Sequence, residues 1–88
     1  MKSENVLGYK GLGPTQQQII DWACANFKLI DGKYYVDALD SIARRKLGYG
    51  VSHMIKSLEH LGCLKDAGKI RTGRYHKLTT RHQIILTN

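Results

Sequence analysis

The most restrictive feature of this sequence is an apolar stripe that ends at a glycine. Apolar side chains recur there at intervals of three and four residues, the spacing that places them on one face of an α-helix. Gly62 follows directly, and glycine is common just past a helix because it adopts positive φ angles. The stripe therefore predicts a helix over about residues 51–61 that packs one face against a core. Its members are Val51, Met54, Ile55, Leu58 and Leu61.

Two more helices are expected before this one. Pro14 suits a first helical turn, and a second apolar stripe predicts a helix over about 14–27. Residues 33–36 are aromatic and β-branched, so they suit a short strand. Asp37 can cap the next helix, which ends before Gly48.

The residues after Gly62 indicate a hairpin. Extended chain is expected from 63, and residues 67–73 read as a glycine-bracketed loop. Residues 74–78 then return as a second strand. The last stretch, 79–88, fits either a strand or a short helix.

Length and composition fit one small domain. Of the 88 residues, 42% are hydrophobic, which is ordinary for a globular chain. We expect a flexible N-terminal arm over 1–13 and the domain over 14–88. No apolar run could span a bilayer and the first residues lack the apolar core of a signal peptide, so we expect a cytoplasmic protein. Cys24 and Cys63 are then best explained as small buried hydrophobes.

The positive charge is concentrated in the second half of the chain. The net charge is +7, yet residues 1–43 hold four lysines against five acids. Residues 44–88 hold ten Lys or Arg against Glu59 and Asp66. Such asymmetry is typical of a protein with a polyanionic partner, usually nucleic acid. Arg44, Arg45 and Lys46 are explained by the end of a helix, where cations are favourable, and contact with phosphate is the alternative.

The order of these elements resembles the winged helix-turn-helix family, as in the DNA-binding domain of LexA repressors and in MarR-like regulators. Residues 49–64 are similar to the family's recognition helix, which runs through a Leu-Gly-x-Leu junction into the wing. Residues 75–79 resemble its second wing strand. The resemblance covers roughly 14–80. It implies an α+β, mostly helical fold with three helices and a C-terminal β-hairpin wing.

The resemblance also implies a function and a set of contacts. The chain would be a sequence-specific double-stranded DNA-binding protein, a small transcriptional regulator of bacterial or phage type. The recognition helix, about 51–61, would enter the major groove, and the basic wing, about 65–77, would lie on the backbone or in the minor groove. The implied contacts are Tyr49, Ser52, His53, Lys56 and Ser57 from the helix region, and Lys65, Lys69, Arg71, Arg74 and Lys77 from the wing.

Two other functions remain open, namely a winged-helix module that binds a protein partner and a binder of structured RNA. A homodimer is a further expectation, since apolar residues of the arm and the tail have no obvious place in the core. We expect no enzyme activity, no cofactor and no metal site, because His60 and Cys63 form at most half of a zinc pattern. The apolar residues in question are Val6, Leu7, Tyr9, Leu12, Ile84, Ile85 and Leu86.

Overall fold

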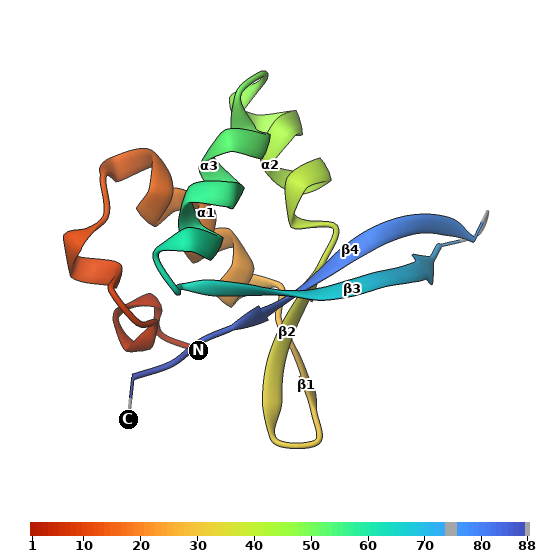
Figure 1. Ribbon diagram of the computed structural model, residues 1–88, viewed down its shortest axis with the longest axis horizontal. Coiled ribbons are helices and arrows are strands. Elements are labelled where there is room, and N and C mark those ends of the chain that lie inside the picture. The colour runs from red at the N-terminus through yellow and green to blue at the C-terminus, as the bar shows by residue number, and fades with distance from the viewer. Residues whose placement is uncertain (74–75, 88) are drawn as a thin grey trace.

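The structure, a computed structural model, describes residues 1–73 and 76–87. Within these residues three α-helices accompany a four-stranded antiparallel sheet, which confirms the α+β class (Figure 1). Two short 3-10 helices precede the first α-helix. In chain order the elements are η1 (Ser3–Asn5), η2 (Tyr9–Gly11), α1 (Pro14–Ala25), β1 (Lys28–Ile30), β2 (Lys33–Asp37), α2 (Leu39–Leu47), α3 (Val51–His60), β3 (Leu64–Thr72) and β4 (Lys77–Ile84).

The sheet has the strand order β1-β2-β4-β3. β2 pairs with β4 only through residues 81–83 of β4. β3 and β4 instead pair along their length, from Leu64 opposite Ile84 to Thr72 opposite Lys77. The outer half of the β3–β4 hairpin is therefore a two-stranded ribbon, and it extends beyond the helices (Figure 1).

β3 passes through residues that we expected to form a loop. A register shift between Asp66 and Lys69 marks a β-bulge. At the bulge Gly68 has a φ of 94°, and its backbone N–H donates to Oδ1 of Asp66 over 2.7 Å. The expected loop over 67–73 is wrong, because the glycine accommodates a bulge and the strand continues to Thr72. The tail adopts the strand alternative, since β4 runs on to Ile84.

Each helix starts where local chemistry permits. Pro14 opens α1, and Oε1 of Gln16 accepts a hydrogen bond from the Gly13 N–H over 3.1 Å. α3 follows Gly50, whose φ of 92° would strain any other residue type. Asp37 was expected to cap α2, and this is wrong. α2 begins at Leu39, and Asp37 ends β2, where it binds two basic side chains.

The core lies between the helices and the sheet. Ile19 and Ile20 of α1 are fully buried, as are Val36 of β2, Leu39 of α2 and Leu58 of α3. Both cysteines are free and buried in the same core, as expected. Burial raises the pKa of each thiol, because a thiolate is poorly solvated there.

The segment expected to be an arm packs against the body of the protein. Val6 is 1% exposed and forms a β-bridge with Leu86, so the two ends of the chain lie side by side (Figure 1). Leu12 and Ile84 are also buried. We expected Val6, Leu12 and Ile84 to be exposed surfaces for self-association, which is wrong because they belong to the core, and Tyr9 and Leu86 pack against it. Leu7, at 40% exposure, is the most exposed of the set.

Candidate nucleic-acid interface

Of the residues expected at the recognition helix, four have exposed side chains and one is hydrogen-bonded within the protein. Ser52, His53 and Lys56 lie on the exposed face of α3. Tyr49 is fully exposed in the turn between α2 and α3. Ser57 is different, because its hydroxyl is half-buried and accepts a hydrogen bond from Nε2 of Gln16 over 3.0 Å. Four of the five side chains can thus meet a ligand directly, while Ser57 helps to hold α3 against α1.

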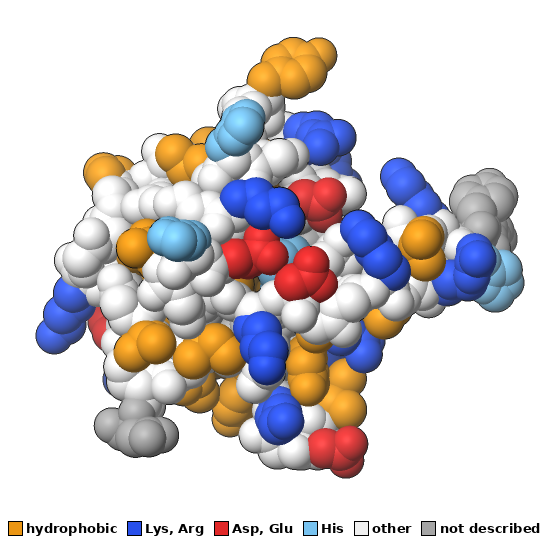
Figure 2. Space-filling model, in the orientation of Figure 1, with side chains coloured by type: hydrophobic (Ala, Val, Ile, Leu, Met, Phe, Trp, Pro, Cys, Tyr) orange, Lys and Arg blue, Asp and Glu red, His pale blue; other side chains and the backbone are white. Residues whose placement is uncertain are grey.

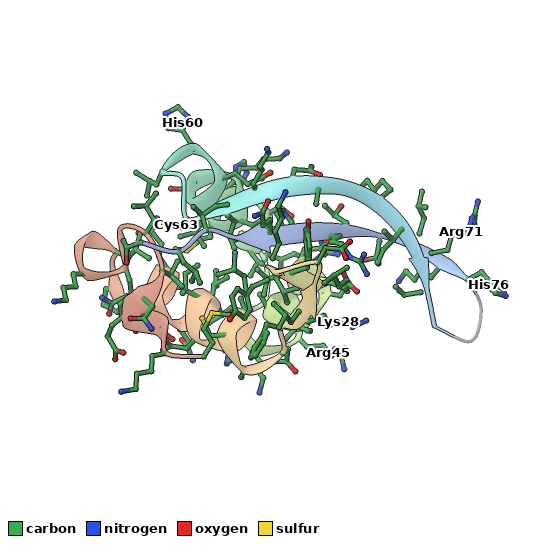
Figure 3. The ribbon with its side chains drawn as sticks, turned by 90° about the horizontal axis from the view of Figure 1, so that it is seen from below. Lys28, Arg45, His60, Cys63, Arg71 and His76 are labelled. Atoms are coloured by element: carbon green, nitrogen blue, oxygen red, sulfur yellow. The ribbon has the colours of Figure 1, made fainter. Side chains whose placement is uncertain are left out.

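The hairpin presents its basic side chains to solvent. Lys65, Lys69, Arg71 and Lys77 are all exposed. Nη1 of Arg71 donates to the backbone oxygen of His76 over 3.2 Å, which orients the guanidinium near the end of the hairpin (Figure 3). Arg74, the remaining residue expected in this set, lies outside the described residues. The hairpin therefore carries a row of cations away from the body of the protein (Figure 2).

One basic residue of this region is not available to a ligand. Arg81 donates from Nε to Oδ1 of Asp37 over 2.7 Å and from Nη2 to Oδ2 over 3.1 Å. The Arg81 guanidinium, aided by Lys28, holds the pKa of the Asp37 carboxyl below its usual range, against the opposing effect of burial. Asp37 in turn raises the pKa of Arg81. This ion pair is a brace between β2 and β4.

The fold also creates a basic cleft that sequence reasoning missed. Asp40, Ser41, Arg44 and Arg45 of α2 line one side of it, so the cleft includes one carboxylate. Lys69 and Lys77 line the opposite side, which is the hairpin, and the cleft has a volume of about 530 Å³. In the described part of the chain, Arg44, Arg45 and Lys77 take part in no ion pair.

Sequence reasoning explained the two arginines by the end of a helix, with contact with phosphate as the alternative, and they do lie in the last turn of α2. Their crowding was the only available signal. The hairpin lies beside α2 because β2 pairs with β4, and the paired residues of these two strands are more than 30 positions apart in the chain.

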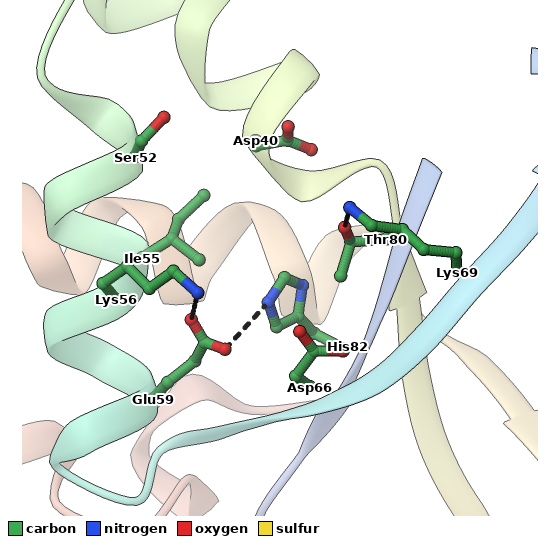
Figure 4. A pocket seen from close by; sticks show the side chains of 9 residues that line it. All are labelled: Asp40, Ser52, Ile55, Lys56, Glu59, Asp66, Lys69, Thr80 and His82. Carbon is green, nitrogen blue, oxygen red and sulfur yellow. Dashed lines mark hydrogen bonds and ion pairs between the residues drawn. The ribbon is translucent and has the colours of Figure 1, made fainter. Parts of the chain in front are cut away.

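A second hollow, here called the acidic recess, lies between α3, the start of α2 and the hairpin (Figure 4). Its carboxylates are Asp40, Glu59 and Asp66, and the buried His82 also lines it. Ser52, Lys56 and Lys69 border the same recess. The fold therefore brings together predicted residues of the helix and of the hairpin, but it sets three carboxylates between them (Figure 2).

No protein-family model, curated protein or solved structure matches this chain. Among residues 1–73 and 76–87, no group of three His, Cys, Asp or Glu side chains is arranged to hold a metal ion. Over the same residues, no helix has the length and apolar character needed to cross a membrane. The candidate site is therefore defined by charge, exposure and shape alone.

Proposed function

We propose that the protein binds double-stranded DNA as a winged helix-turn-helix module and has no catalytic activity. The observation that carries the proposal is the basic cleft, in which Arg44 and Arg45 face Lys69 and Lys77. Arg44, Arg45 and Lys77 converge on one groove and take part in no ion pair among the described residues. Such cations fit a phosphate backbone, which supplies a large share of the affinity of DNA-binding proteins.

The topology supports the proposal. α2, a short glycine-bounded turn and α3 are followed by a hairpin whose second strand pairs with β2, the strand that precedes α2. These elements support the proposal because the resemblance implied three helices and a C-terminal β-hairpin wing. In this proposal α3 enters the major groove with Ser52, His53 and Lys56 toward the base edges. Arg71 and the rest of the outer hairpin lie on the backbone or in the minor groove.

A titration of fluorescent random-sequence duplex DNA at two salt concentrations tests the proposal. If four to six phosphates are neutralised, log K should fall against log salt with a slope of about −4 to −5. Duplex RNA of the same length should compete poorly. Equal competition by RNA would favour an RNA-binding function, and the absence of DNA binding at low salt would contradict the proposal.

A protein-binding module is the second candidate, and a specific observation favours it. Three carboxylates line the acidic recess beside α3, and carboxylates repel a phosphate backbone. A function in DNA binding alone gives this recess no role.

A further inference from the structure

Two buried acceptor atoms lie at the acidic recess without a hydrogen-bond partner. Among the described residues they are Oδ1 of Asp40 and Nδ1 of His82. The His82 side chain is only 4% exposed, and both residues line the same hollow of about 160 Å³ (Figure 4). Buried polar atoms are nearly always hydrogen-bonded in folded proteins. Two such atoms at one recess indicate a donor from outside the chain, which can reach them only when the two side chains turn toward the recess, because both atoms are buried.

The position of Glu59 decides which nitrogen of His82 is the acceptor. Nε2 of His82 lies 3.7 Å from Oε1 of Glu59. A neutral imidazole carries its proton on one nitrogen and a lone pair on the other. A proton on Nε2 is favoured because it faces a carboxylate, and Nδ1 then presents its lone pair. With the side chains turned toward it, the recess offers acceptors from both Asp40 and His82.

The positive side chains around the recess lie nearer the solvent than Asp40 and Glu59. The Glu59 side chain is 17% exposed, whereas the Lys56 side chain that lies 3.7 Å from it is 77% exposed. Lys69 is exposed as well, and its Nζ donates to Oγ1 of Thr80. The lysines thus lie at the rim, while Asp40, Glu59 and His82 form the interior. The interior favours a cationic donor, and the carboxylates disfavour a phosphate.

We infer that the acidic recess binds the guanidinium of an arginine presented by a protein partner. A guanidinium is planar, always charged, and has five N–H donors and no acceptor. It can therefore pair with Glu59 and, once the Asp40 and His82 side chains turn toward it, satisfy both buried acceptors. A cavity of about 150 Å³ holds a benzene ring, so a recess of this size accepts a flat group. A nucleobase fits less well, because it brings a phosphate toward three carboxylates.

An NMR titration of the full chain at neutral pH tests this inference. The probe is N-acetyl-arginine N-methylamide, and the matched control is the citrulline derivative, which has nearly the same shape but no charge. The arginine derivative should produce saturable shifts in the His82 ring and in the amides of Asp40 and Glu59. Equal shifts with both compounds, or no saturable shift, would overturn the inference. Saturable binding of cytidine in place of the arginine derivative would also overturn it, in favour of a base.

Two substitutions locate the binding site. Asp40→Asn and Glu59→Gln each keep the shape and remove a charge, and each should weaken the arginine derivative about tenfold, the effect of removing one charge-assisted hydrogen bond. Asp31→Asn is the control, because Asp31 is an exposed acid in the β1–β2 turn and does not line the recess. Unchanged binding in both recess variants would overturn the inference. Since DNA binding is measured separately, either proposal can fail without the other.

Discussion

Arg81 grips Asp37 with two parallel hydrogen bonds, Nε to Oδ1 at 2.7 Å and Nη2 to Oδ2 at 3.1 Å. The pair joins β4 to β2 at the last position where these strands are paired. Lys28 of β1 adds a third interaction over 3.0 Å to the same carboxylate. Asp37 thus links β1, β2 and β4. It also neutralises Arg81, which a count of the basic residues alone would include among the cations available to a ligand.

Replacing Asp37 with Asn should lower the free energy of unfolding by about 1–3 kcal/mol, because two guanidinium hydrogen bonds weaken and Arg81 loses its counter-charge. The pKa of Asp37 is lowered in the folded protein. Its contribution to stability is therefore present above the unfolded pKa, about 3.9, and is lost as the pH falls through the folded value. Urea unfolding at pH 7 and below pH 3 measures both effects. Lys28→Gln is the control and should cost less, because Lys28 is 59% exposed. Equal loss of stability at both pH values would contradict the assignment.

Arg44→Gln combined with Arg45→Gln should weaken DNA binding regardless of sequence. If each arginine neutralises one phosphate, the slope of log K against log salt should become shallower by about 2. Fluorescence anisotropy at several salt concentrations measures this. Lys2→Gln with Lys10→Gln removes the same charge from the N-terminal segment and should change the slope less. Equal effects of the two pairs would mean that only net charge matters.

His53→Ala combined with Lys56→Ala should reduce discrimination between DNA sequences more than it reduces overall affinity. Both side chains lie on the exposed face of α3, where base edges are expected. Selected duplexes should bind more tightly than random ones. Removing a side chain that binds a base through two hydrogen bonds should reduce this difference in binding free energy by about 1–3 kcal/mol. Selection of preferred sites for the wild type and the variant is the measurement. Identical preferences would exclude α3 as the reader of sequence.

Gly50→Ala should destabilise the protein by about 1–2 kcal/mol. The φ of Gly50 is 92°, and among the described residues no atom beyond its two chain neighbours lies within 4 Å of the position that a Cβ would take. The cost is therefore one of backbone conformation and not of packing. Gly11→Ala is a matched control, because that site is equally open and its φ is not positive. It should change stability by less than about 0.5 kcal/mol. A similar loss in both variants would refute this explanation.

Neither cysteine should react readily with a thiol reagent in the folded protein. Cys63 is 0% exposed and Cys24 is 4% exposed, and burial raises the pKa of both thiols. Both thiols should react quickly with the reagent in denaturant and slowly without denaturant. Rapid reaction of one thiol under native conditions would show that its part of the core opens easily.

The helices could be predicted from the sequence because their signals are local. The apolar stripe predicted residues 51–61, and α3 is Val51–His60. The strand expected over 33–36 is β2, Lys33–Asp37. The hairpin was harder, because β3 is exposed along most of its length and has no apolar alternation to mark it. β1 was missed for a similar reason, since only Leu29 and Ile30 distinguish it from the turn that follows.

The candidate site depends on contacts between distant parts of the chain. The exposure of Lys56 and His53 followed from the helix period, so those residues could be proposed from the sequence. The basic cleft depends on α2 lying beside the hairpin, where the Ala38 N–H donates to the Thr80 oxygen over 3.1 Å. Nothing in the spacing of Arg44 and Lys77 indicates that they face one groove. The burial of His82 was equally hidden, because a polar residue in a polar strand gives no sign of being inside.

The unsupported outer half of the β3–β4 hairpin has a consequence for how this protein can change. Over residues 77–80, β4 pairs with β3 alone among the described strands, and an isolated pair of strands contributes little to the stability of a domain. The exposed cations Lys69, Arg71 and Lys77 therefore contribute little to the packing of the core. Substitutions there can alter the strength and the preference of binding while the fold stays intact. This ribbon is the part of the molecule in which substitutions can change binding specificity with the smallest loss of stability.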